Sequence, residues 1–222
     1  MKKYLSIFKK YSFILSSAAL ILYVIFEAGD SLIGAIRGYK LFDFDVIFNI
    51  ALIFAGVLML LRKIKYAAIP FGVAALIDFI WLSTYTSNLL KNLLNFGSKA
   101  IKMLPLGSLN VFFSYFTTIS GLLAMLALGA LCVFVFLGRM PKSTKLWYIP
   151  TVCQLAAFVL GFFESTISFT VQLFSPVGFL MKLLCFYDFI AATVIGLLLL
   201  LAVAFTNLAI YTYTLLPQRM KY

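Results

Sequence analysis

Long apolar runs, separated by short polar connectors, dominate the pattern of residues along this chain. A helix needs about 20 apolar residues to cross the roughly 30 Å of hydrocarbon in a bilayer. Six runs approach or exceed that length: 11–26, 44–61, 66–85, 110–137, 147–166 and 183–213. They are continuously apolar and do not alternate, which favours helices over barrel strands. The pattern predicts an all-α, polytopic membrane protein with six transmembrane helices in a single domain, 1–222.

The six runs fall into three similar pairs. AALILYVIFEAGDS from Ala18, AALIDFIWLSTYTS from Ala74 and AAFVLGFFESTISF from Ala156 each follow a basic, aromatic segment, and each is followed by a second apolar run. Pro70 and Pro150 both fall near the predicted start of a helix, where a proline removes no helical hydrogen bond. We therefore predict three tandem antiparallel hairpins. Chance similarity between apolar segments is the alternative.

The connector between the third and fourth runs has a helical pattern of its own. On a helical wheel its Asn, Lys and Ser residues occupy about a third of the circumference and its Leu, Ile, Met, Phe and Ala residues occupy the rest. Pro105 then ends the pattern. We predict an amphipathic helix at about 88–104 that lies in the outer membrane interface. A lid over a cavity and a partner-binding helix are the alternatives.

Basic and acidic residues are distributed unevenly between the two predicted sides of the membrane. Six spans place both termini on one side of the membrane, and that side carries twelve of the 18 basic residues and none of the seven acids. Short loops rich in Lys and Arg stay in the cytoplasm, so we expect a cell-membrane protein with both termini cytoplasmic. Anionic lipid and topology account for the net charge of +11 without nucleic acid as a partner. The alternative for the opening MKKYLSIFKK is the basic start of a secretory signal.

Asp78 interrupts the third apolar run about two thirds of the way across from the cytoplasm. A charge at such a depth costs about 2.5–3.5 kcal/mol, so it should face the bundle interior, find a partner or be protonated. Asp188 opens the sixth run, and Glu164 and Ser168 share one face of the fifth. We expect these four residues to line an outward-facing polar pocket between the third, fifth and sixth helices. Structural pairing of Asp78, and solvation of Glu164 and Asp188, are the alternatives.

Other polar residues within the runs suggest structural roles. Asn49 and Gln154 are expected to make interhelical hydrogen bonds worth about 0.6–2 kcal/mol each. Trp81 and Tyr85 are expected at the outer membrane interface, where aromatic side chains are enriched. Three glycines are expected to allow close approach of helices: Gly121, Gly129 and Gly196.

The composition argues against several classes of chemistry. The chain has no histidine, which removes the usual metal sites and imidazole-based nucleophile pairs. Cys132, Cys153 and Cys185 are isolated in different runs and read as buried small hydrophobic residues. No Gly-rich phosphate loop and no G-x-S-x-G turn is present. We expect no metal, no cofactor and no enzymatic activity.

These features favour a small, permease-like or solute-binding membrane subunit. Its outward-facing acidic pocket would hold a cation, a proton or a cationic solute. The alternative is a non-transporting scaffold, or an assembly or accessory subunit of a larger membrane complex. The expected partners are the lipid bilayer, identical copies, or another membrane or ATPase subunit, because this chain carries no ATP-binding motif for primary pumping.

Overall fold

The computed structural model describes residues 2–37, 44–99, 105–138, 144–176 and 178–219. Within these ranges the chain is helical and contains no strand. The elements are α1 (Lys2–Ile36), α2 (Phe44–Leu60), α3 (Ile64–Lys99), α4 (Pro105–Phe136), the 3-10 helix η2 (Thr144–Tyr148), α5 (Ile149–Leu173) and α6 (Phe179–Arg219). Every α-helix except α2 contains an apolar segment long enough to cross a membrane. These helices indicate a multi-pass membrane protein, as expected.

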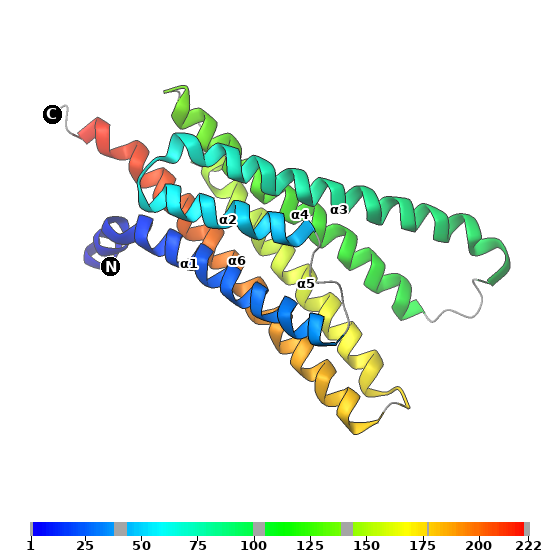
Figure 1. Cartoon of the computed structure of the whole chain (residues 1–222). Coiled ribbons are helices and arrows are strands. Elements are labelled where there is room, and N and C mark those ends of the chain that lie inside the picture. The colour runs from blue at the N-terminus through cyan, green and yellow to red at the C-terminus, as the bar shows by residue number, and fades with distance from the viewer. Residues whose placement is uncertain (1, 38–43, 100–104, 139–143, 177, 220–222) are drawn as a thin grey trace.

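The six helices form a closed ring. Each helix packs against its neighbours in the chain, and α6 returns to pack against α1. α4 also contacts α6 across the ring. The two termini and the turn between α2 and α3 lie at the same end of the bundle (Figure 1). Because helices pack between the predicted hairpins as well as within them, the ring does not single out three pairs.

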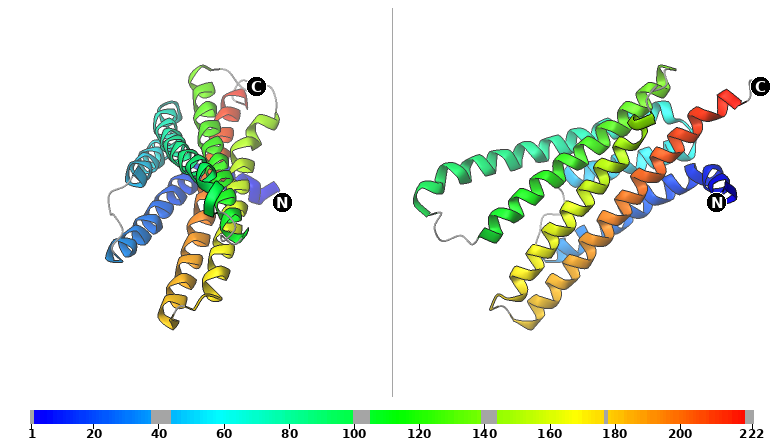
Figure 2. Two further views of the ribbon diagram at one scale, coloured as in Figure 1. Left: turned by 90° about the vertical axis from the view of Figure 1, so that its right-hand side faces the viewer. Right: turned by 180° about the vertical axis from the view of Figure 1, so that it is seen from behind.

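The core occupies only one half of the bundle. Every buried residue of α1 precedes Glu27, and every buried residue of α3 precedes Asp78, whereas those of α4 and α6 begin at Ala124 and Ala202. We call this end, which holds the termini, the packed half. At the other end the α3–α4 pair diverges from the α5–α6 pair (Figure 2), and no described residue there is buried, so we call it the splayed half.

In the packed half, buried polar contacts link α1 to α6 along the line where the two helices pack, which we call the α1–α6 seam. The hydroxyl oxygens of Ser16 and Thr206 are 2.7 Å apart, and those of Ser12 and Thr212 are 3.1 Å apart. All four residues are buried. Hydroxyl pairs of this kind satisfy each other in the low-dielectric interior, which explains why small polar residues interrupt both apolar runs.

Several helix ends differ from the prediction, and the largest differences are in α1 and α3. α1 continues past Phe26 to Ile36, because Glu27 and Asp30 break the apolar run without breaking the helix. α3 continues without interruption to Lys99, so the predicted separate amphipathic helix at 88–104 is, as far as Lys99, a continuation of the third span. Residues 100–104 lie outside the described ranges.

Pro70 and Pro150 occupy different positions in their helices. Pro150 lies in the first turn of α5, as predicted. Pro70 is the seventh residue of α3, which begins at Ile64. It would lie past the first turn even in a helix that begins at the predicted Tyr66, so the prediction that Pro70 removes no helical hydrogen bond is wrong. A proline at that position cannot donate to the carbonyl of Tyr66, so one helical hydrogen bond is missing. The early start follows from a tight turn in which the backbone N–H of Lys63 donates to the carbonyl of Leu58 at 2.8 Å.

The space around the three predicted glycines confirms the need for a small residue only at Gly196. A Cβ on Gly129 would contact Phe71 of α3 at 3.8 Å, and a Cβ on Gly196 would come within 3.1 Å of the ring of Phe158 on α5. A Cβ on Gly121 would lie 3.8 Å from the Asp78 carboxylate. The distances at Gly129 and Gly121 are ordinary contacts that an alanine would also make, so only at Gly196 does the missing side chain allow an unusually close approach.

Candidate functional site

A cavity of about 380 Å³ lies at the boundary between the packed and splayed halves. Its volume falls within the range of about 300–1,000 Å³ that is typical of small-molecule pockets. All six α-helices contribute to its lining: Tyr23, Glu27, Phe48, Asn49, Ile77, Asp78, Trp81, Thr117, Thr118, Gly121, Met125, Gln154, Ala157 and Leu199. The ring of helices therefore surrounds a partly open chamber whose wall is both polar and apolar.

Two carboxylates line this cavity, Glu27 from α1 and Asp78 from α3. None of the described residues in the lining is Lys or Arg. Carboxylates this far along membrane-spanning helices are costly and are placed facing an interior or aqueous space. The Asp78 carboxylate lies close to Gly121 of α4. The electrostatic character of the chamber therefore favours positive charge.

Three buried acceptor atoms around the cavity have no hydrogen-bond partner among the described residues. They are Oδ1 of Asn49, Oε1 of Gln154 and Oγ1 of Thr117. Gln154 is 3% exposed and Asn49 is 9% exposed. Leaving such a group unpaired costs about 1–3 kcal/mol, and buried polar groups are nearly always paired. These three oxygens have almost no accessible surface, so a hydrogen-bond donor in the cavity, water or ligand, reaches them when their side chains turn towards it.

The remaining wall of the cavity is aromatic and apolar. The rings of Tyr23 and Phe48 meet edge to face with their centroids 6.5 Å apart. Trp81 adds an indole from α3, and Ile77 and Leu199 add aliphatic surface. Aromatic faces attract cations, and aliphatic side chains bury the apolar part of a ligand.

The packed half closes one end of this chamber. Gln154 lies only about one and a half turns after the start of α5, so the cavity reaches towards the packed half. Beyond it, the side-chain nitrogen of Asn207 donates to the carbonyl of Trp147 and, at 3.1 Å, to the hydroxyl of Thr151. The ring of Trp147 packs edge to face on that of Tyr211, with centroids 5.2 Å apart.

The four residues predicted to share a pocket lie in different places. Asp78 lines the cavity. The hydroxyl of Ser114 on α4 donates to the carboxylate of Glu164, which is thus held between α4 and α5. Asp188 accepts a hydrogen bond from Arg37 at 2.6 Å across the α1–α6 seam. Ser168 is half-buried on α5 and is not part of the lining.

The Arg37–Asp188 ion pair joins α1 to α6 at the splayed end of the α1–α6 seam. The Arg37 guanidinium also lies over the ring of Tyr187, 5.3 Å from its centroid. Its hydrogen bond to Asp188 raises the pKa of Arg37 above its ordinary value, so the arginine stays charged throughout the working pH range. The Asp188 side chain is 55% exposed, and pairs with that exposure contribute about 0–1 kcal/mol.

Several residues of the cavity had other predicted roles. Trp81 lines the chamber and does not simply sit in an interfacial belt. Asn49 and Gln154 were expected to bond across helices, yet their side-chain oxygens have no partner among the described residues. Glu27 lines the cavity although it follows the end of an apolar run. The sequence feature that could have indicated these cavity residues was the presence of amide and acidic side chains within the apolar runs.

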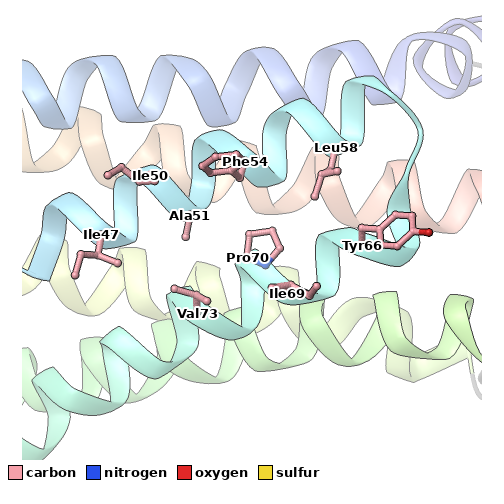
Figure 3. A pocket seen from close by; sticks show the side chains of 9 residues that line it. All are labelled: Ile47, Ile50, Ala51, Phe54, Leu58, Tyr66, Ile69, Pro70 and Val73. Atoms are coloured by element: carbon pink, nitrogen blue, oxygen red, sulfur yellow. The ribbon is translucent and has the colours of Figure 1, made fainter.

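A second, apolar groove of about 330 Å³ lies between α2 and α3. Figure 3 shows its lining: Ile47, Ile50, Ala51, Phe54, Leu58, Tyr66, Ile69, Pro70 and Val73. Its largest side chains are exposed on the outside of the ring, including Phe54 at 62% and Ile69 at 69%. In a membrane protein such a surface contacts acyl chains, so it carries no recognition chemistry of its own.

The cysteines and acids offer no metal centre within the described residues. No group of three His, Cys, Asp or Glu side chains there is arranged to hold a metal ion. Cys132 is buried as predicted, whereas Cys153 and Cys185 are partly exposed. The thiol of Cys185 donates to the side-chain oxygen of Gln172.

The chain matches no protein-family model, no curated protein and no solved structure. The polar chamber is therefore the feature that points to a function. It brings acidic groups, unpaired acceptors and aromatic rings together in one cavity.

Proposed function

We propose that this chain is a small permease-like or solute-binding membrane protein whose central cavity binds a cation or a cationic solute. The observation that carries the proposal is the chamber lined by Glu27 and Asp78 together with the unpaired oxygens of Asn49, Gln154 and Thr117. The carboxylates would attract a bound cation, and its hydrogen-bond donors would pair with the unpaired oxygens. The chamber adjoins the splayed half, which supports entry of the solute from that end.

We further propose that the splayed half faces the outside and that both termini are cytoplasmic. The support is the sorting of charge, because the exposed Arg62, Lys63 and Lys65 lie at the α2–α3 turn beside the termini. Reporter fusions test this orientation. A cytoplasmic reporter should be active when joined before Lys2 and inactive when inserted after Pro176, and the reverse pattern would overturn the outward-facing arrangement.

The three tandem hairpins and the partners also remain proposals. The second alanines of the repeated segments, Ala19, Ala75 and Ala157, are all buried, which supports an equivalent packing role in each hairpin. A chain without an ATP-binding motif is proposed to work within the lipid bilayer, with identical copies or with another membrane or ATPase subunit supplying any energy.

Substitution of Asp78 tests the proposed function. The purified full chain is titrated with Na⁺, K⁺, Mg²⁺ and n-butylammonium at constant ionic strength, and binding is followed through the fluorescence of Trp81 and through thermal stabilisation. Asp78→Asn should lose the response while its melting temperature stays within about 2 °C of the wild type. Asp188→Asn, which removes a carboxylate outside the cavity, should keep the response.

The scaffold alternative makes the opposite prediction. If Asp78 only holds helices together, Asp78→Asn lowers the melting temperature or the capture of a partner, and the wild-type protein responds to none of the cations. A wild-type protein without any cation response, or an Asp78→Leu variant that folds and binds normally, would overturn the proposed function.

A further inference from the structure

We infer that the ligand of the central cavity is a protonated primary amine with a short apolar body, an inference that rests on the proposed cation-binding function. The first argument is size. At about 380 Å³ the chamber is an order of magnitude larger than the roughly 30 Å³ occupied by one water molecule. A bare metal ion would fill a small part of it.

The composition of the wall also argues against a metal ion. Mg²⁺ and Ca²⁺ require six or more oxygen ligands that converge on one point. Here the acidic groups, Glu27 and Asp78, share the wall with Phe48, Ile77 and Leu199, which cannot act as ligands. A ligand that has an apolar part as well as a charge matches this mixed lining better than an ion surrounded by oxygens.

The unpaired acceptors distinguish between kinds of organic cation. A quaternary ammonium ion carries positive charge but no N–H, so the oxygens of Asn49, Gln154 and Thr117 would stay unpaired when it binds. A primary ammonium group carries three N–H donors and can satisfy such atoms once their side chains turn towards the chamber. The three acceptors come from α2, α4 and α5.

The aromatic and aliphatic side chains of the cavity also suit an alkylammonium ligand. Tyr23, Phe48 and Trp81 present rings to the same chamber, and such rings attract an ammonium group within about 6 Å of their centroids. The aliphatic side chains of Ile77 and Leu199 remain to cover an alkyl chain. The order of affinity should therefore be primary alkylammonium, then quaternary ammonium, then inorganic cations.

Competition between small probes tests this order. The purified full chain is titrated at pH 7.5 with n-butylamine, tetraethylammonium, 1-butanol, Na⁺ and Mg²⁺, again with Trp81 fluorescence as the readout. A Trp147→Phe background leaves Trp81 as the only tryptophan. n-Butylamine, which is protonated at this pH, should bind at least about tenfold more tightly than tetraethylammonium or 1-butanol.

Variants of the acceptors show whether N–H donation causes that preference. Gln154→Met and Thr117→Val should each weaken n-butylamine binding about tenfold and leave tetraethylammonium unchanged. Thr193→Val is the matched control, because the Thr193 hydroxyl donates to the carbonyl of Phe189 in its own helix and does not line the cavity. Thr117→Val keeps the test decisive if Gln154→Met fails to fold.

The outcomes separate this inference from the proposed function. Tighter binding of tetraethylammonium or Mg²⁺ than of n-butylamine would overturn the amine and leave a cation-binding protein. Equal losses of both organic cations in Thr117→Val would also overturn it, because hydrogen-bond donation would then not be the cause. Absence of binding by every cation would overturn the proposed function itself.

Discussion

Replacement of Gln154 by Met should make the protein more stable. The Gln154 side chain is 3% exposed, and its Oε1 has no partner among the described residues. An unpaired buried oxygen of this kind costs about 1–3 kcal/mol. Met has a similar length and shape and removes that cost, while loss of a hydrogen bond from the amide nitrogen would give back about 1 kcal/mol. The expected net gain is about 1 kcal/mol.

For a domain of this size, about 1 kcal/mol corresponds to a rise of about 2–4 °C in melting temperature. Thermal unfolding of the purified protein in detergent, followed by circular dichroism, measures this shift. Gln172→Met on the same helix is the matched control. Its side chain is exposed and accepts the Cys185 thiol, so this substitution should produce no rise.

The melting temperature of Gln154→Met, taken together with its ligand binding, shows why position 154 carries an amide side chain. A stabilised Gln154→Met variant that also loses n-butylamine binding would mean that the oxygen is kept for a ligand at the expense of stability. A fall of more than about 2 °C in melting temperature, with ligand binding intact, would show that Gln154 is a structural residue. The interpretation of its oxygen as a ligand acceptor would then be refuted.

Three further predictions concern glycine packing, a hydroxyl pair and an ion pair. Gly196→Ala should lower the melting temperature by several degrees because its new Cβ meets an aromatic ring of α5 at 3.1 Å, whereas Gly72→Ala, with nothing within 4 Å, should raise it slightly in the same unfolding assay. A double-mutant cycle of Ser16→Ala and Thr206→Val should give a coupling energy of about 0.6–1.7 kcal/mol, and a value near zero would contradict the hydrogen bond. Asp188→Asn should cost less than about 1 kcal/mol, with an effect that shrinks in high salt as measured by urea or SDS unfolding.

The helices were predictable because the length of an apolar run reflects the thickness of the bilayer. The ends of the helices were not, because a helix continues beyond the lipid wherever the backbone allows it. Glu27 ends an apolar run but lies inside α1, and Lys99 lies at the end of the same helix that crosses the membrane with Asp78. Polarity marks where hydrocarbon ends, whereas hydrogen bonding of the backbone decides where a helix ends.

The cavity was predictable only in part. Asp78 stood out because a single charge within an apolar run needs a polar environment. Asn49 and Gln154 resembled ordinary interhelical contacts, since the sequence does not reveal whether a buried oxygen finds a donor on a neighbouring helix. Asp188 and Glu164 were grouped with Asp78 because all three lie in the outer parts of their runs, but the packing directs Asp188 towards Arg37 and Glu164 towards Ser114. Depth along a helix does not determine which way a side chain points around it.

The confinement of the core to one half of the ring has a consequence for how a solute can travel. Under the proposed function, a solute that enters between the diverging helices stops at the buried side chains of the packed half and leaves by the end at which it entered. Passage to the opposite side would require the packed half to open, including contacts between α1 and α6 such as the buried hydroxyl pair of Ser16 and Thr206. A protein of that kind binds and releases its solute on one side of the membrane.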